Sequence, residues 1–236
     1  MKKFFLSFAF LLLFFGSYAQ KTAEEFLNAA NEKFQKQNYT EAIIDYDNAI
    51  ELNPNLNEAY FNRGLAERKM LDYTAAIFNF DKVIELNPNH IYAYLYRGLS
   101  KIALKDYSGA ITDFDKVIEL NSTIADAYYN RGLCKYINKD YVNAIKDFDK
   151  TIEIDPKSTD AFTFRGNSYK KINKLPESII DYDKAILLDP TNTNAYINRG
   201  IAKYLSEKET EACEDWKKAS DLGNKSADQI IKDNCK

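Results

Sequence analysis

The sequence repeats itself with a fixed period of 34 residues, and this period restricts the fold more than any other feature. The dipeptide Arg-Gly marks the period and recurs at residues 63, 97, 131, 165 and 199. Six units follow one another without insertion or deletion, at 23–56, 57–90, 91–124, 125–158, 159–192 and 193–226. A unit of this length cannot bury its own apolar face, so the units are expected to stack into an elongated array.

Each unit has the pattern of two helices joined by short turns. In the second unit, Ala76, Phe80 and Val83 recur at steps of three and four residues, which is the spacing of an apolar helix face. Pro88 follows between two asparagines and ends that helix, because proline cannot continue one. Pro176 falls at the start of a second helix, where a missing N–H is tolerated. The sequence therefore predicts an all-α fold of helix–turn–helix units.

The units share an aromatic residue at their fourth position and a small residue at their eighth. The aromatics are Phe26, Tyr60, Tyr94, Tyr128, Phe162 and Tyr196, and the small residues are Ala30, Gly64, Gly98, Gly132, Gly166 and Gly200. This register resembles the tetratricopeptide repeat (TPR) over nearly the whole chain. The resemblance implies a right-handed superhelical solenoid of six repeats within residues 20–236. An apolar stripe within residues 227–236 predicts a C-terminal capping helix.

The first residues have the three-part pattern of a secretory signal peptide. Lys2 and Lys3 precede an apolar run over residues 4–15, and a small-residue exit ends at Ala19. We expect residues 1–19 to be cleaved as a signal peptide near Ala19, which makes the protein exported, either periplasmic or secreted. The alternative is an uncleaved membrane anchor, but the run is short for a span of about 20 residues. No second run of this length follows, so no membrane span is expected in the mature chain.

An arginine precedes the glycine in five units, and an acid recurs in the second helix. The acids are Asp45, Asp113, Asp147, Asp181 and Asp215, with Asn79 in their place in the second unit. We expect a ladder of ion pairs worth about 0–1 kcal/mol each when partly exposed. The sequence alone does not say which aspartate meets which arginine. Pairs such as Asp147 and Asp149 are suited to acid–base catalysis, but their repetition at one helix position indicates a structural role.

The resemblance also implies a peptide-binding groove on the concave face, lined by the first helix of each unit. Carried over position by position, its residues are Asn28, Asn31, Phe61, Asn62, Tyr96, Tyr129, Asn130, Tyr136, Phe164, Asn167 and Asn198. Aromatic side chains offer contact area at low entropic cost, and asparagine can bond a peptide backbone as donor and acceptor. Acids at the second position of four units favour neutral or basic segments. The alternative is that the aromatics pack between neighbouring helices.

The cysteines and the single histidine lead to separate expectations. In an exported protein, Cys213 and Cys235 are expected to form a disulfide that ties the capping helix to the last unit. Chain-entropy reasoning assigns such a loop roughly 3 kcal/mol. Cys134 is expected to be a buried free thiol, and the alternative is that all three cysteines are reduced. His90 follows Pro88-Asn89 and is expected to be a solvated turn residue.

Composition and motifs exclude several functions. The formal net charge is −3 and no basic stripe occurs, so no nucleic-acid partner is expected. A single histidine excludes His-rich zinc sites, and no phosphate- or dinucleotide-binding motif occurs, so we expect no enzyme activity and no cofactor. The resemblance implies a protein–protein interaction scaffold of the cell envelope with a protein or peptide partner. The alternative is a structural protein that self-associates end to end, and carbohydrate binding is the weakest interpretation.

Overall fold

Six helix pairs and one final helix follow one another along the chain. The structure is a computed structural model that describes residues 21–235. The first helices of the pairs, called A helices here, are α1 (Ala23–Gln35), α3 (Asn57–Lys69), α5 (Ile91–Ala103), α7 (Ala125–Ile137), α9 (Thr159–Lys171) and α11 (Thr193–Leu205). The B helices are α2 (Tyr39–Leu52), α4 (Tyr73–Leu86), α6 (Tyr107–Leu120), α8 (Tyr141–Ile154), α10 (Leu175–Leu188) and α12 (Glu209–Asp221), and α13 (Lys225–Asn234) is the last helix. All six A helices begin at the residue where the 34-residue register starts a unit.

Side-chain caps fix the helix starts. Thr22 and Glu25 form a reciprocal capping box at α1, and the carboxylate of Asp106 accepts a backbone N–H in the first turn of α6. His90 caps α5 in the same way, because its Nδ1 accepts the N–H of Ala93 at 3.1 Å. Its ring lies 4.8 Å from that of Phe61, and burial lowers its pKa. The expectation of a solvated turn residue was therefore wrong.

In five of the six pairs, the two helices cross where a glycine faces an aromatic ring, and the first pair has Ala30 at this position. Gly132 of α7 lies against Phe148 of α8, which is fully buried. A Cβ atom added at Gly132 would be 2.9 Å from Phe148 Cε1, closer than real side chains approach. The same close approach recurs at Gly64, Gly98, Gly166 and Gly200. The small residue of the repeat register is therefore required by the crossing.

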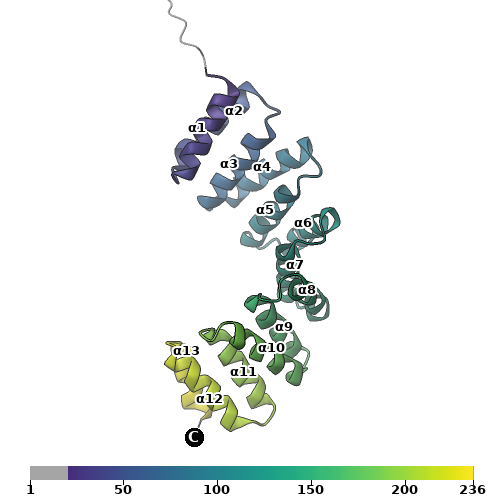
Figure 1. Cartoon of the computed structure of the whole chain (residues 1–236), viewed down its shortest axis with the longest axis vertical. Helices are drawn as coiled ribbons and strands as arrows, with labels where there is room; N and C mark the ends of the chain where they lie inside the picture. The colour runs from purple at the N-terminus through teal and green to yellow at the C-terminus, as the bar shows by residue number, and fades with distance from the viewer. Residues whose placement is uncertain (1–20, 236) are drawn as a thin grey trace, which may run out of the picture.

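The pairs stack along a curved path, so that the chain winds from α1 at one end to α13 at the other (Figure 1). Each B helix packs against the A helix of the next pair, and neighbouring A helices also touch each other. Contacts between neighbouring B helices are all but absent within residues 21–235. The A helices therefore lie on the inner side of the curve, and we call the surface that they form the inner face. The prediction of an all-α superhelical solenoid is confirmed.

The turn between the A and B helices contains one residue in the left-handed conformation in every repeat. The six residues are Gln37, Leu71, Lys105, Lys139, Asn173 and Glu207, with φ between 61° and 65°. Only asparagine among these types adopts that conformation readily, and no glycine occurs there. Sequence reasoning missed this feature because the side chains give no sign of a left-handed residue.

Replacing Leu71 by asparagine is expected to raise the free energy of unfolding by about 0.5–1 kcal/mol. Leu71 has φ 65° and is 69% exposed, so little packing is lost when the strain is relieved. Thermal unfolding followed by circular dichroism measures the change. Leu71→Ala removes the same apolar surface and keeps a Cβ, so it should be close to neutral. An asparagine variant no more stable than the alanine variant would contradict the account.

The two ends of the stack differ from its middle. In the later repeats, the third and tenth positions of the A helix hold small buried residues, as at Ala59 and Ala66. In α1 these positions hold Glu25 and Glu32, and both are exposed. At the other end, α13 packs on α12 through Ala227, which is fully buried. Polar residues thus cover one end of the stack and an added helix covers the other.

A disulfide joins Cys213 of α12 to Cys235, just after α13, as the sequence predicts, with Cα atoms 5.8 Å apart. Cys134 is a buried free thiol, as expected, and burial raises its pKa to about 12. The predicted signal peptide over residues 1–19 lies outside the described residues. Among residues 21–235, no helix has the length and apolar character needed to cross a membrane.

Candidate functional site

The predicted groove aromatics of the second and third repeats pack between helices. The ring of Phe61 in α3 lies 5.9 Å from that of Phe80 in α4 and 5.9 Å from that of Tyr96 in α5. Tyr96 in turn stacks on Phe80 at 6.2 Å. Phe61 and Tyr96 remain half-buried rather than fully buried, so part of each ring still faces solvent.

A second cluster of the same kind joins the fourth and fifth repeats. Phe164 of α9 contacts Tyr129 at 6.1 Å and Tyr136 at 5.8 Å, and it stacks on Phe148 at 6.1 Å. Burial raises the pKa of Tyr129 to about 12. All five predicted groove aromatics therefore join adjacent helices, which is the alternative that the sequence left open. Truncating them would loosen the fold as well as any binding surface.

Two of the predicted groove asparagines also have a partner inside the fold. The side-chain oxygen of Asn31 accepts the hydroxyl of Tyr46 at 2.8 Å, and Asn167 accepts that of Tyr182 at 2.8 Å. In both repeats the asparagine is at position nine and the tyrosine at position twenty-four. Three other repeats combine leucine with phenylalanine at these positions, as at Leu133 and Phe148. This pairing is visible in the sequence and could have identified the structural role.

The remaining asparagines differ in how much of their bonding capacity is free. Asn62 donates to Asn31 at 2.9 Å, and Asn130 donates to the carbonyl of Asp126 in its own helix at 2.7 Å, so both keep a side-chain oxygen for another donor. Asn198 donates to Asn194 and accepts from Lys170. Asn28 is exposed. The inner face therefore retains polar groups mainly at Asn28, Asn62 and Asn130.

The most exposed aromatic of the A helices is one that the sequence analysis did not place in the groove. Tyr92 of α5 is 57% exposed, and it shares a helix stripe with Tyr96 and Leu99, one and two turns further along. Further along the stack, Ile137, Tyr204 and Leu205 are between 38% and 57% exposed near the ends of α7 and α11. These side chains give the inner face apolar surface that the fold leaves uncovered.

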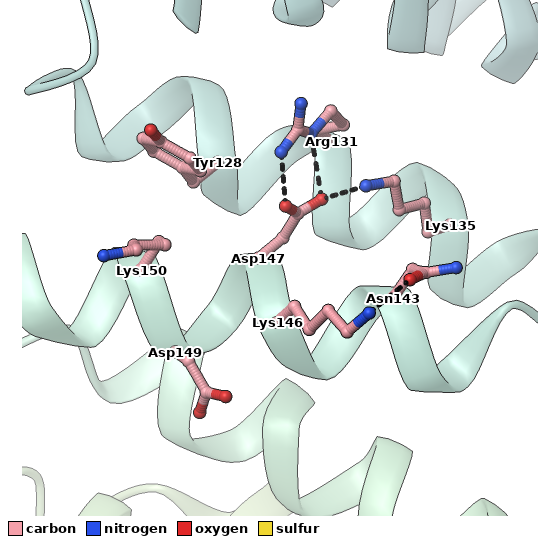
Figure 2. A pocket seen from close by; sticks show the side chains of 8 residues that line it. All are labelled: Tyr128, Arg131, Lys135, Asn143, Lys146, Asp147, Asp149 and Lys150. Carbon is pink, nitrogen blue, oxygen red and sulfur yellow. Dashed lines mark hydrogen bonds and ion pairs between the residues drawn. The ribbon is translucent and has the colours of Figure 1, made fainter.

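A ladder of arginine side chains joins the two helices of one repeat to each other, at Arg63, Arg97, Arg131, Arg165 and Arg199. In each case Nε and Nη2 of the arginine donate to the side chain 16 residues later, on the B helix of the same repeat, which is an aspartate in four repeats and Asn79 in the second. Arg131 meets Asp147 at 3.0 and 2.6 Å, and Lys135 donates to the same carboxylate at 2.7 Å (Figure 2). The guanidinium also lies over the ring of Tyr128, at 5.6 Å.

The third donor of each arginine joins neighbouring repeats. Nη1 of Arg131 donates to Asp115 at 2.5 Å, and Asp115 lies 16 residues earlier on the preceding B helix. The same pattern holds for Arg63, Arg97, Arg165 and Arg199. The two members of the pairs Asp113/Asp115, Asp147/Asp149 and Asp181/Asp183 are therefore bound by two different arginines, which answers the question that the sequence left open.

The expected strength of the ion pairs needs correction for the aspartates that pair within a repeat, but not for those that pair between repeats. The aspartates within a repeat are buried, with side chains 1–5% exposed at Asp113, Asp147, Asp181 and Asp215. Those between repeats, such as Asp115, are about half exposed, and only there does the 0–1 kcal/mol expectation apply. Burial raises the pKa of Asp181, whose repeat has Tyr169 where four others have a lysine.

The ladder stops at both ends of the stack. Ala29 takes the arginine position in the first repeat, and Asp45 pairs with Lys33 instead, at 2.7 Å. In the last repeat, Lys217 takes the position of the aspartate that would meet a following arginine. In the ion pair that joins neighbouring repeats, the first repeat thus lacks the arginine and the last repeat lacks the aspartate.

Two cations of the inner face, by contrast, have no acidic partner among the described residues. Arg68 of α3 and Lys170 of α9 each occupy the twelfth position of their repeat, where the other repeats have Phe34, Ile102, Tyr136 and Tyr204. Burial lowers the pKa of Arg68 and lowers that of Lys170 to about 8. No group of three or more histidine, cysteine or acidic side chains within residues 21–235 is arranged to hold a metal ion.

Comparisons with known proteins agree with this geometry. Two models described as tetratricopeptide repeat match residues 58–90 with 125–158, and 92–122, and a third described as TPR repeat matches 30–70 and 166–207. No curated relative matches the chain.

Three solved structures illustrate the likeness. MamA is 27% identical with a TM-score of 0.66, over 70% of this chain and 96% of MamA. YrrB, described as a TPR protein with an unusual peptide-binding site, is 21% identical with a TM-score of 0.70, over 80% of this chain and 97% of YrrB. A tetratricopeptide repeat protein from Parabacteroides merdae is 24% identical with a TM-score of 0.61, over 89% of this chain and 83% of that one. Since the matched segments cover more than half of the sequence and the helix pairs stack as in these structures, this chain belongs to the tetratricopeptide repeat family.

Proposed function

We propose that this protein is an exported, non-enzymatic adaptor of the cell envelope that holds a peptide segment of a partner protein on its inner face. The observation that carries the proposal is the uncovered apolar and polar surface of the A helices, on which Tyr92 is 57% exposed and Asn28 is exposed. YrrB, which shares the fold, is described as having a peptide-binding site, and this supports the same use of the fold here. Export rests on the signal pattern of residues 1–19.

A preformed surface of this kind suits segment binding for an energetic reason. Rings of the inner face are already fixed by neighbouring helices, as Phe61 is by Phe80 and Tyr96. Little side-chain entropy is then lost by the receptor when a partner binds. The carboxylates that might have served catalysis are taken up by the arginine ladder, which supports a binding role.

End-to-end self-association, the alternative function, has less support. At the C-terminal end, α13 already packs on α12, so it covers the face against which α1 of a second copy would stack. Glu25 and Glu32 would then have to enter positions that elsewhere hold buried alanine or another small residue. Burying such carboxylates without partners costs several kcal/mol. The proposal therefore expects a constant monomer mass in light scattering as protein concentration rises, and a growing mass would favour stacking.

The test of segment binding is selection of random 15-residue peptides displayed on phage against the purified protein. Selected peptides should lose about tenfold in affinity on Tyr92→Ser, because truncating an exposed aromatic anchor commonly costs more than 1 kcal/mol. Phe78→Ser on α4 is the matched control, since Phe78 is also 57% exposed but belongs to a B helix. Affinity is measured by fluorescence anisotropy, and circular dichroism checks that both variants keep their helix content.

The outcomes separate the possible surfaces. Loss on Tyr92→Ser with none on Phe78→Ser supports the inner face. Loss on Phe78→Ser alone would assign binding to the B helices. Failure to select any peptide would remove segment binding as the function.

A further inference from the structure

Arg68 and Lys170 each bridge two neighbouring A helices of the inner face. The guanidinium of Arg68 lies over the rings of Tyr96 at 5.6 Å and Tyr73 at 5.9 Å, and Nη1 donates to Ser100 Oγ at 2.9 Å. Lys170 donates from Nζ to Asn198 Oδ1 at 2.7 Å, across the boundary between α9 and α11. Both side chains are thus held at fixed points on the surface by neutral groups.

The lack of a carboxylate distinguishes these two cations from the other half-buried basic side chains of the A helices. The ladder arginines each contact two acidic or amide side chains, and Lys33, Lys101, Lys135 and Lys203 each contact an aspartate. Neighbouring aspartates raise the pKa of Arg97 against the opposing effect of burial, whereas the pKa of Arg68 and that of Lys170 are lowered. A partly desolvated charge without a counter-charge is unfavourable in the free protein and becomes favourable when an anion arrives.

Arg68 also keeps donors that a ligand can reach. Only its Nη1 has hydrogen-bond partners, so Nε and Nη2 are unused within residues 21–235. No buried side-chain nitrogen or oxygen in this part of the chain lacks a partner. The unused N–H groups must therefore be accessible to solvent, and an arginine edge with two free N–H groups matches the geometry of a carboxylate.

We propose that the partner segment is acidic, and that its aspartate or glutamate side chains pair with Arg68 and Lys170 while its apolar residues contact the rings between them. This inference rests on the proposed function and specifies the chemistry of the partner. Adjacent contacting helices are about 10 Å apart, so the two cations, three repeats apart, are separated by roughly 30 Å. An extended segment of 15 residues spans about 50 Å and can reach both.

The acids of the inner face do not oppose this assignment. Glu58 and Asp160 lie at the second position of their A helices, ten residues before Arg68 and Lys170. Ten residues of helix correspond to roughly 15 Å, which exceeds the screening length of about 8 Å at physiological ionic strength. The second-position acids thus lie at one edge of the inner face, and Arg68 and Lys170 lie toward the other edge. The expectation of neutral or basic partners considered the acidic edge alone.

The experiment uses peptides selected from the 15-residue library on the purified protein. Selected sequences should be enriched in aspartate and glutamate relative to the unselected library. Arg68→Gln and Lys170→Gln should each weaken binding of a selected peptide at least about tenfold, because a charge-assisted hydrogen bond is lost. Lys146→Gln on α8 and Lys184→Gln on α10 are matched controls, since each makes the same kind of charge change at an exposed lysine of a B helix, away from the inner face. These controls should change affinity less than about twofold.

A peptide carrying asparagine and glutamine in place of its acids completes the test. It should bind the native protein about as weakly as the acidic peptide binds the double variant Arg68→Gln/Lys170→Gln, and it should lose nothing further on that double variant. Lys170→Arg and Arg68→Lys keep the charge and should retain most of the binding, which guards against a variant that merely folds poorly. Selected peptides without acid enrichment, or equal losses in the Lys146 and Lys184 controls, would overturn the acidic-segment assignment and leave segment binding intact. Failure to select any peptide would instead remove the proposed function.

Discussion

Replacing Asp113 by alanine is expected to lower the free energy of unfolding by about 3–5 kcal/mol, because it leaves buried cations without their counter-charge. The side chain of Asp113 is 1% exposed. It accepts hydrogen bonds from Arg97 Nε at 3.1 Å and Nη2 at 2.5 Å, and Lys101 Nζ lies 2.8 Å from it. Urea unfolding followed by circular dichroism measures the change.

A second alanine variant, at an exposed aspartate of the ladder, tests whether burial sets the strength of these ion pairs. Asp115→Ala removes a ladder acid that is 54% exposed, and it should cost no more than about 1 kcal/mol. If the two alanine variants differed by less than about 1 kcal/mol, burial would not control the strength of the ladder, and the account would be wrong.

The second repeat shows which second substitution should restore the stability that a substitution of Asp113 removes. There Asn79 accepts Arg63 Nε at 2.9 Å and donates to Glu67 at 2.6 Å, so an amide and a glutamate replace the aspartate and lysine of other repeats. Asp113→Asn alone should be destabilising, because its amide then faces Lys101. Adding Lys101→Glu restores the arrangement of the second repeat and should recover most of the loss. A double variant no better than the single one would show that the two positions are not coupled.

The 34-residue period made the fold predictable from sequence to within single residues at the start of every A helix. The residues that mark the starts and ends of the helices recur in every repeat, so the register does not depend on any single residue. The partner of each ladder arginine was not predictable in the same way. A guanidinium has donors in several directions, and the two aspartates that it bridges, such as Asp147 and Asp115, lie at equal sequence distances on either side.

The candidate site was predicted less well, because residues on one helix stripe can face either a ligand or a neighbouring helix. Phe61 and Phe164 fit the groove register, yet their rings contact rings of neighbouring helices. Arg68 and Lys170 stand out in the sequence as the two basic residues at the twelfth repeat position, but their lack of an acidic partner is visible only in the structure. The asparagine–tyrosine pairing at Asn31 and Tyr46 was available in the sequence as a correlation between two repeat positions.

Replacing Gly132 by leucine is expected to cost more than about 3 kcal/mol, since the new side chain must enter the closest contact of the helix pair. A Cβ at this site lies 2.9 Å from Phe148 Cε1 and 3.1 Å from Asp147 Cβ, and neither group can move freely. Phe148 is fully buried and Asp147 is held by Arg131 and Lys135. Thermal unfolding measures the loss.

The matched control for Gly132→Leu is Ala103→Leu, which adds leucine to an A helix at an exposed position and should change stability by less than about 0.5 kcal/mol. Gly132→Ala should already be destabilising, because the clash begins at Cβ rather than at the end of a flexible chain. Because each repeat contacts only its neighbours, the damage should be largest in the fourth repeat. Hydrogen exchange should therefore show faster exchange in α7 and α8 than in α1 and α2. A uniform increase along the chain, or an alanine variant as stable as the native protein, would contradict the role assigned to this glycine.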